Sequence, residues 1–256
     1  MAISTPTTII ATGNTANLQV YDTAAVTLTA DRLYIIVVNG YSSGGGVALD
    51  FIRHDPLGTA LDFIQITDGT DIAQILNWDA ALHRALHVWY VIPSTTTANA
   101  LIRIDWSATQ SACGWRLIEI ASGFQTGSTS TIFPGVATNV DAGAGTAITC
   151  TMASFAATDN MTLLCMGWGS GTSNPTQTVA ETESRTELGE HGDGERGRQG
   201  VHYQNPHGSD TSIGATLSAA NEWGAIGIEI AAAGAVAAAR KAGRLSLLGC
   251  GHGAPK

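Results

Sequence analysis

The chain has 256 residues, of which only 13% are charged, and its formal net charge is −9 at pH 7. This length suits one large domain or two ordinary ones, and a hydrophobic content of 44% can build a core, which argues against a disordered chain. An acidic chain lacks the positive surface that phosphate binding needs, so we expect no nucleic-acid partner.

We also expect no membrane insertion, because no apolar run reaches the roughly 18 residues of a membrane-spanning helix. Residues 1–6 have neither the basic start nor the apolar stretch of a secretory signal, which predicts a protein that begins in a cytoplasm. The four cysteines have no metal-type spacing. Cys150 and Cys165 lie in apolar runs and are interpreted as small core residues.

Short strand-like runs dominate the first half of the chain. Residues 33–38 form an Ile- and Val-rich run between Asp31 and the turn at Asn39 and Gly40, which predicts a buried strand. Further strands are predicted at 47–53, 61–67, 89–92, 100–106 and 115–121. In residues 71–87 the apolar positions recur at helical spacing after Asp71, a plausible N-cap, so we expect one short helix there.

The second half continues in the same style. Strands are predicted at 132–133, 147–152, 161–166, 176–182, 201–204, 212–217 and 225–230. Residues 183–210 are polar, charged and Gly-rich, which predicts a long exposed loop. Many short strands between Gly, Ser and Asn turns indicate an all-β fold, specifically an antiparallel β-sandwich or jelly roll.

The two halves of the chain resemble each other. The segment that begins at Asp31 matches the one at Asp159, and Tyr90 and Pro93 match Tyr203 and Pro206. The closing Ile-Glu-Ile-Ala of residues 118–121 recurs at 228–231. We therefore predict an internally duplicated fold with a first sandwich unit at 1–123, a second at 124–234 and a C-terminal tail at 235–256.

The tail differs in charge from the rest of the chain. Residues 1–239 hold 8 of the 12 basic residues and all 21 acidic ones, so they carry −13, whereas the tail carries four basic residues and no acid. Ala-rich composition favours a helix near 235–246. The tail is a candidate anchor on an acidic partner, through Arg240, Lys241, Arg244, Leu247 and Leu248, or else a solvated chain end.

Three histidines form a second candidate interaction group. His191, His202 and His207 lie close together in the sequence with Asp193, and imidazole with carboxylate suits zinc or nickel. No pair has helical ligand spacing, and the intervening glycines favour a solvated loop, so we predict no metal site. The Gly192–Gly197 segment lacks the alternating ligands of a calcium loop, and we predict no cofactor.

No residue group predicts catalysis. Glu119 and Glu229 are equivalent under the duplication and could in principle form the carboxylate pair of a glycosidase, but each lies mid-strand, where an outward polar residue or an arginine partner is expected. No nucleophile elbow or phosphate-binding loop is present in the sequence. The six tryptophans are mostly core candidates, although Trp168 or Trp223 could stack on a sugar.

The acidic turn before a long apolar strand, closed by a strand with a Glu near its end, resembles a group of tailed-bacteriophage virion proteins with duplicated jelly-roll-like halves. Asp31, Asp159, Glu119 and Glu229 occupy the matching positions, and the resemblance covers residues 25–234. It departs at the 183–210 segment and in the basic tail. Members of that group are capsid decoration, head-fibre, neck or tail components.

The resemblance implies a non-enzymatic structural protein of the virion, assembled in the host cytoplasm. We expect capsid decoration or another head-associated role, with the chain bound as an oligomer to itself and to other virion proteins such as the major capsid protein. The alternatives are a glycan-binding module of a tail or fibre, and an enzyme that uses acidic residues.

Overall fold

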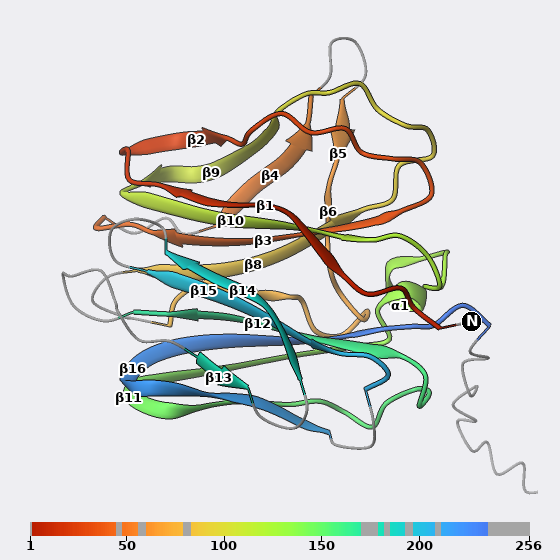
Figure 1. Cartoon of the computed structure of the whole chain (residues 1–256). Coiled ribbons are helices and arrows are strands. Elements are labelled where there is room, and N and C mark those ends of the chain that lie inside the picture. The colour runs from red at the N-terminus through yellow and green to blue at the C-terminus, as the bar shows by residue number, and fades with distance from the viewer. Residues whose placement is uncertain are drawn as a thin grey trace, which may run out of the picture.

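Figure 1 shows the computed structural model of the protein, which describes residues 2–44, 48–55, 60–78, 83–169, 179–181, 185–192, 197–207 and 211–234. The strands form three sheets in stacked layers, and every strand pair is antiparallel. This confirms the predicted all-β sandwich architecture. Among the described residues no helix has the length and apolar character needed to cross a membrane.

The outer sheet forms the first layer, with strand order β2-β9-β4-β5. Its strands are β2 (Leu18–Asp22), β4 (Leu49–His54), β5 (Leu61–Asp62) and β9 (Ile102–Gln110). Along β9 the residues alternate between buried Ile102, Ile104 and Trp106 and the more exposed Arg103 and Asp105. One face of the outer sheet therefore packs inward, and the other faces solvent.

The middle sheet has the strand order β1-β10-β3-β8-β6, and β7 also pairs with β8. Its strands are β1 (Thr7–Asn14), β3 (Leu33–Tyr41), β6 (Ile64–Gln65), β7 (Gln74–Ile75), β8 (Arg84–Val91) and β10 (Ala112–Ile120). All nine residues of β3 are buried. The sheet has a core on each side, which explains why the sequence of β3 is a continuous apolar run.

The third sheet has the order β11-β16-β12-β15-β14, and β13 pairs with β16. Its strands are β11 (Gly135–Thr151), β12 (Met161–Trp168), β13 (Val179–Glu181), β14 (Thr186–Gly192), β15 (Arg198–Gln204) and β16 (Ser212–Ile230). The helix α1 (Thr129–Ile132) precedes β11.

The long strands β11 and β16 fold back over their own sheet. Their register is irregular between Asp141 and Ala147, and Ala144 there has a positive φ of 59°. Beyond this corner, Ile148 and Ile213 lie in one core cluster with Trp168, which is on β12 of the same sheet. The second unit thereby makes both layers of a sandwich from one folded sheet, with its own small core.

The strand orders of the two units correspond. The order β1-β10-β3-β8-β6 in the first unit matches β11-β16-β12-β15-β14 in the second. Register agrees as well: Ile35 lies opposite Tyr90, and Leu163 lies opposite Tyr203. The sequence matches of the duplication are therefore equivalent positions in two copies of one strand arrangement, and each unit keeps its own strands in the described part of the chain.

The two units share their largest core. Buried apolar residues of the middle sheet, such as Ile35 and Ile118, lie in one cluster with Leu163 and Ile228 of the third sheet. Each unit also contacts the other through the edge strand of its sheet. Thr8 on β1 of the first unit donates a hydrogen bond to the Leu188 carbonyl of the second unit at 3.4 Å, and Val136 N on β11 of the second unit donates to Asp68 of the first unit at 3.2 Å. A common core makes the units interdependent rather than two separate globules.

Two predicted elements are wrong in type. The predicted helix at 71–87 is absent from the described residues 71–78 and 83–87, because β7 and β8 pair there, with Ile75 opposite Leu86. Ala73 and Ile75 are buried while Ile72 and Leu76 are 46% and 45% exposed, which is a strand alternation set by pairing with β8. The one described helix is instead α1.

The 183–210 segment is likewise not one long loop. It contains β14 and β15, and β15 pairs with the buried strand β12. The segment is rich in glycine, which has a low strand propensity, so its sequence does not predict the full extent of these strands. Gly189 on β14, for example, lies at a register shift in the pairing with β15 and has a φ of +123°.

We predict that Gly40→Ala destabilises the protein by about 1–3 kcal/mol, because overpacking a filled core forces its neighbours to shift. A Cβ on Gly40 would overlap the indole ring of Trp106 in the core between the outer and middle sheets. Gly44→Ala is the matched control, since nothing lies within 4 Å of the Cβ that it adds. Urea unfolding of both variants measures the difference, and equal stabilities would contradict the packing described here.

Candidate interaction surface

The structure tests only some of the predicted interaction residues. Residues Arg240, Lys241, Arg244, Leu247 and Leu248 lie outside the described residues. His191, His202 and His207 are described, and they do not come together. No group of three or more His, Cys, Asp or Glu in the described part of the chain is arranged to hold a metal ion.

The histidines point in different directions. His191 on β14 lies opposite Gln199 on β15, and His202 has the other parity on that strand, so the two imidazoles lie on opposite faces of the third sheet. His202 is fully buried. His207 is also buried, stacks on Phe155 with ring centroids 3.8 Å apart, and has Nε2 2.7 Å from the Ala157 carbonyl oxygen. The solvated loop expected around these histidines is therefore a set of packed side chains.

His191 faces the boundary between the two units. Its Nε2 lies close to Gly114 on β10, where an added Cβ would be 3.3 Å from it. Burial, together with the guanidinium groups of Arg116 and Arg198, lowers the pKa of His191 to about 4. The neutral ring is thus the form that the folded protein favours.

This shift predicts acid sensitivity. The unfolded chain, with a histidine pKa of 6.5, takes up the proton before the folded protein does, so the stability linked to neutral His191 is present above pH 6.5 and is lost as the pH falls towards 4. His191→Gln should abolish a loss of about 3 kcal/mol across that window. Chemical unfolding of both proteins at several pH values tests this, and parallel pH profiles would contradict it.

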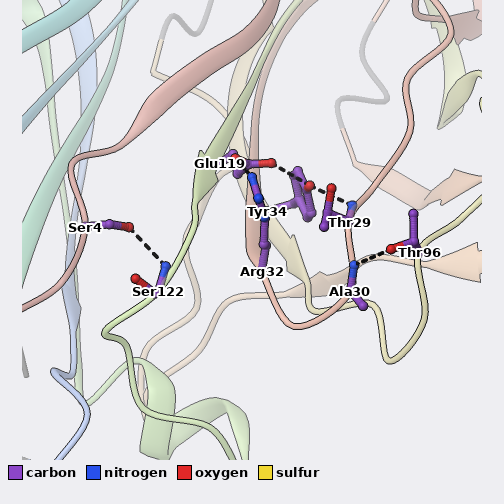
Figure 2. Close-up of polar contacts among 8 residues, drawn as sticks. All are labelled: Ser4, Thr29, Ala30, Arg32, Tyr34, Thr96, Glu119 and Ser122. Carbon is purple, nitrogen blue, oxygen red and sulfur yellow. Dashed lines mark hydrogen bonds and ion pairs between the residues drawn. The ribbon is translucent and has the colours of Figure 1, made fainter.

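Glu119 belongs to a polar network at the end of the middle sheet (Figure 2). Arg32 Nη1 lies 2.6 Å from Glu119 Oε1, and the Tyr34 hydroxyl donates to Glu119 Oε2 at 2.6 Å. The Tyr34 oxygen in turn accepts a hydrogen bond from Thr29 N at 2.8 Å. Burial, and then the bond to Glu119, raise the pKa of Tyr34. The carboxylate thus ties β10 to β3 and to the turn before β3.

Glu229 performs the same task in the second unit. Its Oε1 accepts from Asn160 Nδ2 at 2.6 Å and from Ala156 N at 2.9 Å. Asn160 is the residue equivalent to Arg32, since each follows the matched aspartate. Burial raises the pKa of Glu229, and its hydrogen bonds oppose that shift. The sequence predicts either an outward polar residue or an arginine partner for each of these glutamates; Glu119 has an arginine, and Glu229 has an asparagine in its place.

The two glutamates do not form a catalytic pair. Glu119 lies on the face of the middle sheet that packs against the outer sheet, because Leu117 on the same strand face belongs to that core. Glu229 lies on the face of the third sheet that turns away from the middle sheet. Two layers of backbone separate carboxylates that glycoside hydrolysis would need within about 10 Å across a cleft.

Tyr34→Phe should destabilise the protein by about 1–2 kcal/mol, because it leaves the partly buried Thr29 N–H and Glu119 without this partner. Tyr203→Phe is the control, since its hydroxyl makes no hydrogen bond within the described residues. Thermal and urea unfolding measure both. A loss in the control as large as that in Tyr34→Phe would remove the role assigned to this network.

The tryptophans do not offer a sugar platform. Trp168 and Trp223, the two proposed for stacking, are 0% and 3% exposed. Trp78, Trp106 and Trp115 are buried as well, and Trp89 is half-buried against the core of the first unit. Sugar stacking needs an exposed ring face, so the glycan site predicted at Trp168 or Trp223 is wrong.

A small cavity lies beside α1. It has a volume of about 150 Å³ and is lined by Ser130, Thr131, Pro134, Ala156, Ala157 and Asn160, among others. Such a volume holds roughly five water molecules and lies below the ordinary range for small-molecule sites. We therefore do not treat it as a ligand site.

The solvent face of the outer sheet carries a ladder of charges that crosses all four strands. Asp22, Arg103, Arg53 and Asp62 are cross-strand neighbours in that order. Arg53 Nε pairs with Asp62 at 2.5 Å, and Arg103 Nε lies 3.2 Å from Asp22. The side chains of this ladder are 39–61% exposed, so it can meet a partner directly.

Further acids surround the two arginines. A register shift between Leu49 and Phe51 leaves Asp50 near Asp105. Asp55, at the end of β4, is close enough to interact with both Arg53 and Arg103. Burial, and then the charge of Asp50, raise the pKa of Asp105, and its Oδ1 has no hydrogen-bond partner within the described residues.

We call this surface the acidic face and define it by Asp22, Asp50, Asp55, Asp62 and Asp105 with Arg53 and Arg103. Five carboxylates against two guanidiniums leave a formal charge of −3. Sequence reasoning missed it, although the alternation along β9 places Arg103 and Asp105 on the polar phase. What joins these residues is cross-strand register, which the order of residues along the chain does not reveal.

On the corresponding outward surface of the second unit, the exposed residues that the structure describes carry no charge. This surface is formed by the end of β11 and the start of β16, where Thr149, Thr151, Thr216 and Ser218 are exposed. The strand arrangement therefore does not itself require the acidic face.

The chain matches no protein-family model, no curated protein and no solved structure.

Proposed function

We propose that the chain is a non-enzymatic structural protein of a tailed-bacteriophage virion. It binds the particle surface as an oligomer, in a capsid decoration or other head-associated role. The observation that carries this proposal is that the potentially reactive side chains of the described residues serve structural roles. Glu119 and Glu229 fasten equivalent strands, and His202 and His207 are packed inside the second unit.

Two further features support a structural role. The stacked sheets bury three apolar clusters in a chain of 256 residues, which gives a rigid body suited to repetitive assembly. A charged content of 13% leaves much of the surface to Thr, Ser, Gly and Ala, which suits a protein packed among copies of itself. The assignment to a phage depends on the sequence resemblance over residues 25–234.

The copy number in purified virions tests this proposal. Quantitative mass spectrometry against the major capsid protein, on particles of the phage whose genome encodes the chain, should find the protein in hundreds of copies. A few dozen copies would contradict the decoration role and favour a neck or fibre position. Absence from the particles, with the protein present in the lysate, would overturn the virion assignment.

A further inference from the structure

We propose that the acidic face of one copy binds the basic C-terminal segment, residues 235–256, of a second copy. This inference rests on the oligomeric part of the proposed function and names the surface and the segment that make the contact. The contact is electrostatic and runs head to tail, because the two surfaces that meet are different.

Charge selects the occupant. Residues 1–239 carry a formal charge of −13, so this part of one copy repels the same part of another. The segment from Arg240 to Lys256 carries four positive charges and contains both lysines of the chain. It is the one strongly cationic stretch that a second copy can present, and it relieves rather than adds to the repulsion.

The acidic face has local features that a cationic peptide satisfies. It carries a formal charge of −3 in a half-exposed setting, and Asp50 and Asp105 repel each other across the register shift. Lysine and arginine side chains can pair with the exposed carboxylates of this face, such as Asp50 and Asp55, and a charge-assisted hydrogen bond is stronger than a neutral one.

A second copy fits the geometry better than the same copy does. The described chain ends at Gly234, just after β16 of the third sheet, while the acidic face lies on the far side of the outer sheet (Figure 1). Two sheet spacings amount to about 20 Å. Arg240 is the sixth residue after Gly234, and six residues in the helix predicted for this Ala-rich stretch would span only about 9 Å.

Two full-length double variants separate this site from bulk charge. Asp50→Asn with Asp105→Asn removes two charges from the acidic face without touching either ion pair of the ladder. Asp71→Asn with Asp159→Asn removes the same charge from exposed sites elsewhere. We expect self-association, measured by sedimentation equilibrium, to weaken roughly fivefold in the first variant and little in the second. Equal weakening of both would overturn the proposal.

A mixing experiment tests whether the contact joins two copies. A third full-length variant, with Arg240, Lys241 and Arg244 all changed to Ser, keeps the acidic face and loses the cationic segment. This variant and the Asp50→Asn/Asp105→Asn variant should each associate poorly alone, and an equimolar mixture should form a heterodimer. If the contact forms within one copy, the mixture will stay monomeric, and the proposal fails.

Salt dependence gives a further check. Association should fall as ionic strength rises from about 0.05 M to about 0.5 M, because screening shortens the Debye length from over 10 Å to a few ångströms. Association that is indifferent to salt would overturn an electrostatic contact. These results do not depend on the copy number in virions. If the protein is absent from particles but its self-association needs the C-terminal segment, only the proposed function fails. If it is present in virions but its self-association does not need that segment, only this inference fails.

Discussion

Burial of the middle sheet on both faces is the constraint on which the rest of the structure depends. Strand β3 at its centre is covered on one side by the outer sheet and on the other by the third sheet, so all nine of its residues are buried. Such a strand cannot carry alternate polar residues, and it cannot be exposed without loss of two cores. The other layers are arranged to cover it.

This constraint explains how the duplication is used. Each unit has a β-sheet that needs an apolar covering, and the unit beside it provides that covering through the shared cluster around Ile35 and Leu163. Hydrogen bonds of Thr8 on β1 and Val136 on β11 also join the edge strand of each unit to the other unit. A chain built in this way resembles a dimer whose halves have been joined, and its stability is a property of both units together.

Polar side chains take structural roles where strands begin and end. Glu119 holds Arg32 and Tyr34, and Glu229 holds Asn160, so the same position fastens the same strands through different partners. The second unit has Asn160 at the position of Arg32 because its glutamate is more deeply buried. Glu229 is 2% exposed, and an asparagine can donate to it without adding a second buried charge. The acidic face is different in kind, because the described residues exposed at the equivalent surface of the second unit, such as Thr149 and Thr216, carry no charge, and the fold does not need it.

Fold class, strand content and duplication followed from the chain itself, because a strand buried on both faces is a continuous apolar run and a repeated unit repeats its spacing. Residues 71–87 and 183–210 were misjudged because pairing with β8 and with β12 outweighed local propensity. The separation of His191 from His202, the burial of Trp168 and the assembly of Asp22, Arg103, Arg53 and Asp62 into one ladder were set by sheet parity and register. These depend on which strands become neighbours, and neighbours in space are chosen by long-range packing rather than by order along the chain.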